Sequence, residues 1–173
     1  MNIKQRVITE KLEELPENIT LVDKYIDYLS CQHQEILKGI TAQQAYITMT
    51  SCQPKWLSIL FKVRDAFAKL GGVEAVKGFN NLQGKDFNIN DKMHFFNIVE
   101  KSDDRLTLVI RDSHLDVCLC MVIVENADKP SINDLHLVTS VKNKNFFGKL
   151  YMLPVSIIHP FIAKKLLVNI NEQ

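Results

Sequence analysis

The spacing of apolar positions changes along the chain and divides it into segments of different predicted structure. Apolar residues recur at steps of three and four in residues 54–70, alternate with polar residues in residues 77–142, and regain a helical character in residues 145–170. A period near 3.6 is typical of an amphipathic helix, and a period of two is typical of a half-buried strand. The order therefore predicts helices, then strands, then a C-terminal helix.

Two helices are predicted before the main run of strands. Thr41 and Gln44 form a capping-box pattern, in which each side chain satisfies a free amide at a helix start. Pro54 suits the first turn of the second helix, where a missing N–H costs nothing, and Gly71 and Gly72 are expected to end that helix. The second helix carries one apolar stripe, formed by Trp56, Leu60, Val63, Phe67 and Leu70.

The strands are closely spaced, which favours antiparallel pairing because parallel strands need long crossovers. A first strand is predicted at residues 21–31, after a lead-in of residues 1–20 that is broken at Pro16. The terminal helix contains Pro154 and Pro160, and we expect each proline to kink or divide it by removing a backbone amide. The later strands are predicted, after one or two short ones, at residues 93–100, 105–112, 114–125 and 134–142.

These elements predict an α+β fold, with a curved antiparallel sheet gripping a long C-terminal helix and two short helices inserted after the first strand. The length of 173 residues fits a single domain over residues 1–173. A sheet that grips a helix often leaves a cavity between the two layers, and such cavities bind apolar ligands.

Composition and charge narrow the function classes. The formal net charge of +1 and the aromatic content of 8% argue against a nucleic-acid partner. The first residues hold no apolar run that could act as a signal peptide, and no window reaches the ~18 apolar residues of a membrane span. We therefore expect a cytoplasmic protein with no membrane span.

The C-terminal part of the chain has an uneven charge. No acidic residue occurs between Asp134 and Glu172, so the segment is either a solvated helix face or a surface that attracts anions such as lipid headgroups or nucleic acid. Its basic residues are Lys142, Lys144, Lys149, Lys164 and Lys165.

A metal site and a cofactor site are not expected. His114, Asp116, Cys118 and Cys120 are metal-ligand types on one face of a predicted strand. Alternate side chains along a strand are ~6.6 Å apart, so four of them in line cannot surround one ion. We interpret His114 and Asp116, together with Gly148, as a structural motif that orients a turn or a strand pair. The cysteines are expected to be reduced thiols.

Three short motifs follow one another along the chain. They are Trp56-x-x-x-Leu60-Phe61-x-Val63-Arg64-Asp65, Asp112-x-His114-Leu115-Asp116, and Asn143-x-Asn145-x-x-Gly148-x-x-Tyr151 with Val155 and His159 beyond it. Together they resemble an uncharacterised, mainly bacterial family of the START-like, helix-grip superfamily, which includes polyketide cyclases and lipid-transfer domains. The resemblance covers roughly residues 21–168 and implies a fold and a cavity, but no particular reaction. The chain departs from the pattern at Ile157-Ile158 and at Val117, where apolar character is kept.

The odd positions of the strand at residues 114–125 form an apolar face, because successive side chains point to opposite sides. We expect this face to line the cavity with Leu115, Val117, Leu119 and Met121. Tyr151 and His159 lie eight residues apart on the terminal segment. They are either polar anchors for a ligand or, respectively, a packed core residue and a histidine hydrogen-bonded at the kink. Arg64 either pairs with a buried carboxylate or binds an acidic group of the ligand.

Three functions remain open at this stage. The leading hypothesis is a non-catalytic protein that binds a small apolar or lipid-like molecule. The second is an enzyme of the cyclase or dehydratase type that uses His159, His114 or Asp116 as a general acid or base. The third is a homodimeric interaction protein, in which the even strand face pairs with a second copy. That face would present Cys118, Cys120, Val122 and Val124.

Overall fold

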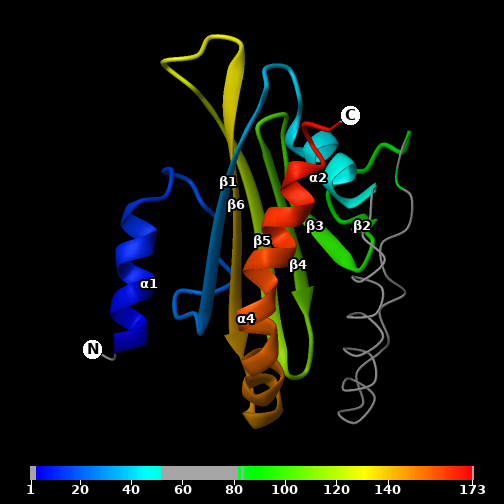
Figure 1. The fold of residues 1–173 in the computed structure, drawn as a ribbon. Coiled ribbons are helices and arrows are strands. Elements are labelled where there is room, and N and C mark those ends of the chain that lie inside the picture. The colour runs from blue at the N-terminus through cyan, green and yellow to red at the C-terminus, as the bar shows by residue number, and fades with distance from the viewer. Residues whose placement is uncertain (1–2, 52–81, 83, 173) are drawn as a thin grey trace.

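The computed structural model describes residues 3–51, 82 and 84–172, and its centre is one curved, open sheet of six antiparallel strands (Figure 1). The strand order is β1-β6-β5-β4-β3-β2, so the last strand lies beside the first and the others follow one another as neighbours. The strands are β1 Tyr28–Leu37, β2 Lys92–Met93, β3 Phe96–Lys101, β4 Arg105–Arg111, β5 Leu115–Glu125 and β6 Ile132–Asn143. The predicted α+β class and antiparallel pairing are confirmed.

Three helices are described, and the second of them begins with the predicted capping box. They are α1 Ile3–Glu13, α2 Ala42–Ser51 and α4 Phe146–Val168. Ahead of α2, the Thr41 amide donates to the Gln44 side chain (2.9 Å), and the Gln44 amide donates to the Thr41 hydroxyl (3.2 Å), as a capping box requires. Asn145 caps α4 by accepting a hydrogen bond from the Gly148 amide at 3.0 Å. The predicted helix at residues 54–70, with Arg64, lies outside the described residues.

The α4 helix runs continuously through Pro154 and Pro160, so of the two expected effects, a kink or a division, the division is wrong. Each proline removes only one backbone hydrogen bond. The other hydrogen bonds of this 23-residue helix, its Asn145 cap and the packing of its C-terminal part hold it together.

The inner face of the sheet packs against α4 and α2 and carries the main core (Figure 1). Leu119, Met121 and Ile123 of β5 lie on this face, and they are buried together with Leu135 and Leu137 of β6. The predicted parity of the strand at residues 114–125 is therefore correct. The same core contains the C-terminal part of α4, represented by Ala163, Leu166 and Leu167.

The outer face of the sheet is covered by the chain itself. The segment before β1 crosses β5 and β6, where the Thr20 amide contacts the Cys120 Sγ (3.5 Å) and the Val22 amide donates to the Ser140 hydroxyl (2.9 Å). The first strand therefore begins at Tyr28 and not at residue 21, because the residues before it lie across the sheet and do not join it.

This covering corrects the expectation that the even face of β5 presents an apolar patch to a second copy. Cys118, Cys120 and Val122 are buried, and of the predicted dimer patch only Val124 is exposed. Thr20 contacts Cys120 through its amide and Cys118 through its carbonyl, so a second copy cannot reach these two side chains. Cys118, Cys120 and Val122 therefore belong to an internal layer.

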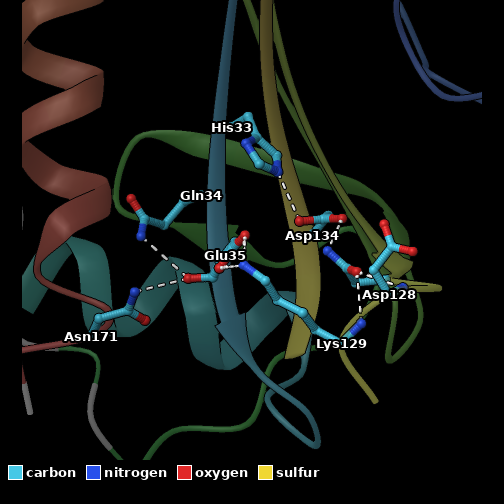
Figure 2. A network of polar contacts seen from close by, with 8 residues as sticks. His33, Gln34, Glu35, Asp128, Lys129, Asp134 and Asn171 are labelled. Atoms are coloured by element: carbon cyan, nitrogen blue, oxygen red, sulfur yellow. Dashed lines mark hydrogen bonds and ion pairs between the residues drawn. The ribbon is translucent and has the colours of Figure 1, made fainter. Parts of the chain in front are cut away.

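A polar network links β1 to β6, to the loop before β6 and to the C-terminal end of the chain (Figure 2). Lys129, in the loop before β6, forms an ion pair with Glu35 of β1 at 2.6 Å. Asp134 contacts His33 at 2.9 Å, and Asn171 donates to the Glu35 carbonyl at 2.8 Å. These contacts fasten the loop and the chain end to β1. Exposed ion pairs of this kind contribute little stability each, so the network has a positioning role.

Candidate functional site

The strand register sets a strip of polar side chains at one edge of the inner face. Tyr28 pairs with Val141, and Ser30 pairs with Thr139, so both β1 residues point to the same side as the apolar core. Parity places Gln32 and Gln34 of β1 on that side as well. The neighbouring strands contribute mainly apolar residues to this face, so β1 supplies polar groups to an otherwise apolar layer.

The α4 helix places His159 over this polar strip. The Tyr28 hydroxyl lies 3.4 Å from His159 Nδ1, and the two rings meet edge to face with their centroids 6.0 Å apart. Burial lowers the pKa of His159 to about 4 and raises the pKa of Tyr28, although the Ser30 hydroxyl partly opposes the second shift. Both groups are therefore neutral at pH 7.

Ser30 adds a hydroxyl that the described part of the chain leaves without a well-formed hydrogen bond. Its residue is 4% exposed, and its Oγ is a buried polar atom with no partner. A buried hydroxyl in this condition costs about 1–3 kcal/mol, so most are satisfied by protein, water or ligand. Ser30 and the Tyr28–His159 pair together form the candidate site, which we call the inner polar cluster.

The four apolar residues predicted to line the cavity occupy different depths. Leu119 and Met121 are buried within the main core. Leu115 and Val117 are half-buried, and Val117 pairs with Val141, which in turn pairs with Tyr28. The inner polar cluster therefore lies at the level of Val117, near the end of the sheet where α4 begins.

Of the two predicted polar anchors, His159 belongs to the cluster, and the ring that contacts it is that of Tyr28. Tyr151 is half-buried on α4 and makes contacts of its own. Sequence reasoning missed Tyr28 and Ser30 as site residues, although both lie within the strand predicted at residues 21–31. The period of two places them on one face, but the contact of Tyr28 with His159 depends on the path of α4 and not on local sequence.

His114, Asp116 and Gly148 surround the start of α4. The Lys144 amide donates to the His114 carbonyl at 2.8 Å, and the Lys144 Nζ pairs with Asp116 at 2.7 Å. The Asn145 side chain reaches His114 Nδ1 at 2.8 Å. A side chain at Gly148 would collide with the His114 carbonyl oxygen, so only glycine allows this close approach.

Strand parity separates this second group from the inner polar cluster. Asp116 occupies an even position of β5, and it pairs with Lys142, which contacts Asp23 outside the sheet. Asp116 and His159 therefore lie on opposite faces. Across the part of the chain that the structure describes, no group of three or more His, Cys, Asp or Glu side chains could hold a metal ion.

A further buried polar contact joins α2 to the turn between β2 and β3. Tyr46 is 1% exposed, and its ring lies 5.7 Å from that of His94. Burial lowers the pKa of His94 to about 4, and the His94 Nε2 lies 3.4 Å from the Thr50 hydroxyl. This contact could not be predicted from the sequence, because His94 lies in a turn with a φ of 57° and interrupts the predicted strand.

The fold and the inner polar cluster define a class of protein: an α+β domain whose curved antiparallel sheet is covered by one long terminal helix, which is compatible with a helix-grip fold. The chain belongs to the DUF2867 family, described as a protein of unknown function, whose family model matches residues 23–166. No curated protein and no solved structure gives a significant match to the chain.

Proposed function

We propose that this chain is a START-like binding protein that holds a small apolar molecule between the inner face of the sheet and α4. The apolar residues on both layers supply the contact surface, and the inner polar cluster orients one end of the molecule. Binding pockets of this type are mainly apolar with a few placed polar groups.

The observation that carries the proposal is the Ser30 hydroxyl, which is buried on the inner face and makes no well-formed hydrogen bond with the described residues. It lies in the same strand as Tyr28, whose hydroxyl is directed at a neutral histidine. A bound molecule with one hydroxyl or carbonyl group would satisfy Ser30 without placing a charge in the layer. A neutral polar end is favoured because the three groups of the cluster are themselves neutral.

The enzyme alternative is less well supported by the geometry. General acid–base chemistry needs groups that converge on the reacting atoms. His159 is the titratable candidate within the layer, whereas Asp116 lies on the other face of the sheet and is paired with Lys144. A histidine with a pKa of about 4 is also a weak base at neutral pH. Binding without catalysis is therefore the function that we propose.

The test is native mass spectrometry of the freshly purified chain, followed by denaturing mass analysis of the released species. We expect an adduct that is lost on denaturation, and Ser30→Ala should reduce its occupancy. The matched control is Ser140→Ala, because Ser140 is equally buried but faces outward and accepts from the Val22 amide. Ser140→Ala should destabilise the fold and leave the adduct in place.

Ser30→Ala has a second expected effect that separates the site from the fold. Because the Ser30 hydroxyl makes no well-formed hydrogen bond with the described residues, its removal should leave the stability of the ligand-free protein unchanged or slightly higher. A clean ligand-free mass, together with no saturable binding of the neutral dye Nile red, would overturn the proposal. Equal retention of the adduct by wild type and Ser30→Ala would remove the inner polar cluster from it.

A further inference from the structure

The α4 helix carries a second apolar face, which points away from the sheet. Its residues recur at steps of four, three, four and four, so at 100° per residue they lie within an arc of about 80°. Their side chains are between 52% and 78% exposed. We call this face the outer stripe; it consists of Phe146, Leu150, Leu153, Ile157 and Phe161.

The outer stripe is distinct from the face that holds α4 to the sheet. The buried residues of the helix include Met152, Ala163 and Leu166, which lie on the opposite side of its axis. The helix is thus apolar on two sides. With 23 residues and a mean hydropathy of 1.4, it is long and apolar enough to cross a membrane, by length and composition only. Only 17% of its most apolar window is buried.

A membrane span would require α4 to leave the sheet and expose the main core. The outer stripe alone can enter the interface of a bilayer while the inner face keeps its packing, as interfacial amphipathic helices do. The apolar residues of the stripe are large, and an exposed apolar patch of this kind marks an interaction site.

Positive charges border the outer stripe. Lys149 precedes Leu150, and Lys164 continues the line of the stripe one turn beyond Phe161. Lys165 adds a third positive charge, and all three lysines are exposed. No acidic residue occurs in the sequence between Asp134 and Glu172 to neutralise them. The face therefore combines apolar insertion with attraction to anions.

The charge pattern distinguishes between two occupants of the stripe. A second copy docked through the same face would bring its own lysines to the first copy's lysines, with no acidic side chain of α4 to separate them. The headgroups of anionic phospholipids complement both features, since basic residues beside a membrane are attracted to its negative surface.

We propose that the outer stripe of α4 docks the protein on the surface of an anionic phospholipid bilayer, with its large apolar side chains in the interface and its lysines against the headgroups. The inference rests on the outer surface of α4 and is independent of the ligand proposed for the inner face. A surface binder of this kind keeps its fold, so the bound and the free protein share one structure.

The first test measures cosedimentation of the full chain with sucrose-loaded vesicles of phosphatidylcholine alone or mixed with phosphatidylserine. The wild type should bind the mixed vesicles and release them as salt is raised. Leu153→Ser with Phe161→Ser should weaken binding about tenfold or more. The control pair, Leu37→Ser with Tyr25→Ser, removes side chains of matching exposure away from α4 and should bind as wild type.

The second test separates charge from insertion. Lys149→Gln with Lys164→Gln should weaken binding to the mixed vesicles at least about fivefold, because one lysine near an anionic surface contributes roughly that factor. The control is Lys85→Gln with Lys92→Gln, which removes the same charge from exposed positions outside α4. All variants change exposed residues, so unchanged circular dichroism and thermal midpoints should accompany these results.

Three results would overturn the proposal. The folded wild type could fail to bind the mixed vesicles. It could bind both vesicle types equally, with no effect of the lysine changes. Size-exclusion chromatography could instead show a concentration-dependent dimer that Leu153→Ser with Phe161→Ser abolishes, which would assign the stripe to a second copy.

Discussion

The two halves of α4 have similar apolar content and opposite environments. In the C-terminal half, Ala163, Leu166 and Leu167 are buried in the main core with the sheet. In the first half, Gly148 and Met152 are the buried residues, and the remaining apolar side chains are half-buried or exposed. His159, which contacts Tyr28, lies just past the middle of the helix, where the looser half meets the tightly packed half. One helix thus joins a region packed into the main core to a region with few buried side chains.

The largest expected effect comes from deleting a side chain in the tightly packed half. Leu167→Ala should lower the free energy of unfolding by about 3 kcal/mol, because it leaves a cavity among fully buried neighbours. Leu153→Ala, on the outer stripe, should change it by less than about 0.5 kcal/mol. Urea unfolding of both variants measures the difference. Equal losses would show that the first half of α4 is as firmly packed as the second.

The second prediction concerns Gly148, where the start of α4 lies close to the backbone of His114. Gly148→Ala should destabilise the fold by about 2–3 kcal/mol, since the added Cβ meets the backbone oxygen of His114, which cannot move aside as a flexible side chain would. Gly39→Ala tests backbone strain and not a steric collision. No atom lies within 4 Å of the added Cβ at Gly39, but the φ of 98° is strained for alanine. A neutral Gly148→Ala variant would mean that α4 is not held closely at its start.

The elements that the sequence predicts well are those with a regular pattern or a local signal. The strands at residues 105–111 and 115–125 were located almost to the residue, because their period of two is regular and one face is continuously apolar. The cap at Thr41 was also identified, since capping depends on local residue types. Local chemistry and periodicity are therefore sufficient for these elements.

The polar cluster and the covered outer face could not be predicted in this way. The start of β1 depends on the segment around Thr20, which crosses the sheet through contacts with Cys120, about one hundred residues away in the chain. The orientation of Tyr28 toward His159 follows from the β1–β6 register and from the path of α4. His159 was singled out as a polar group of α4, but its partner depends on tertiary packing that a single sequence does not encode locally.

The third prediction tests the inner polar cluster through the titration of His159. The pKa of His159 is about 4 in the folded chain and near 6.5 when unfolded, so the unfolded state binds more protons between these values. Stability should therefore fall as pH drops from about 6.5 to 4. We expect His159→Asn to remove about 1–2 kcal/mol of that fall, as measured by urea unfolding at several pH values.

His94 provides the matched control for this pH series, because burial lowers its pKa to about 4 at a different site. His94→Asn should remove a similar share of the acid destabilisation, and asparagine tolerates the positive φ at that position. Binding of an apolar ligand should respond differently. Acid should weaken binding in wild type and in His94→Asn, but not in His159→Asn, if His159 alone lies against the ligand.

The smallest expected effects come from removing the N-caps of α2 and α4. Thr41→Ala should cost about 1 kcal/mol, the usual loss for an N-cap. Asn145→Ala should cost somewhat more, because Asn145 accepts from the Gly148 amide and also contacts His114 Nδ1. Asn145→Asp keeps the acceptor for the amide and removes the side-chain amide. If Asn145→Asp is as stable as wild type, the cap alone holds the first turn of α4. A loss equal to that of Asn145→Ala would instead assign the holding contact to His114, and the start of α4 would then depend on the β4–β5 turn.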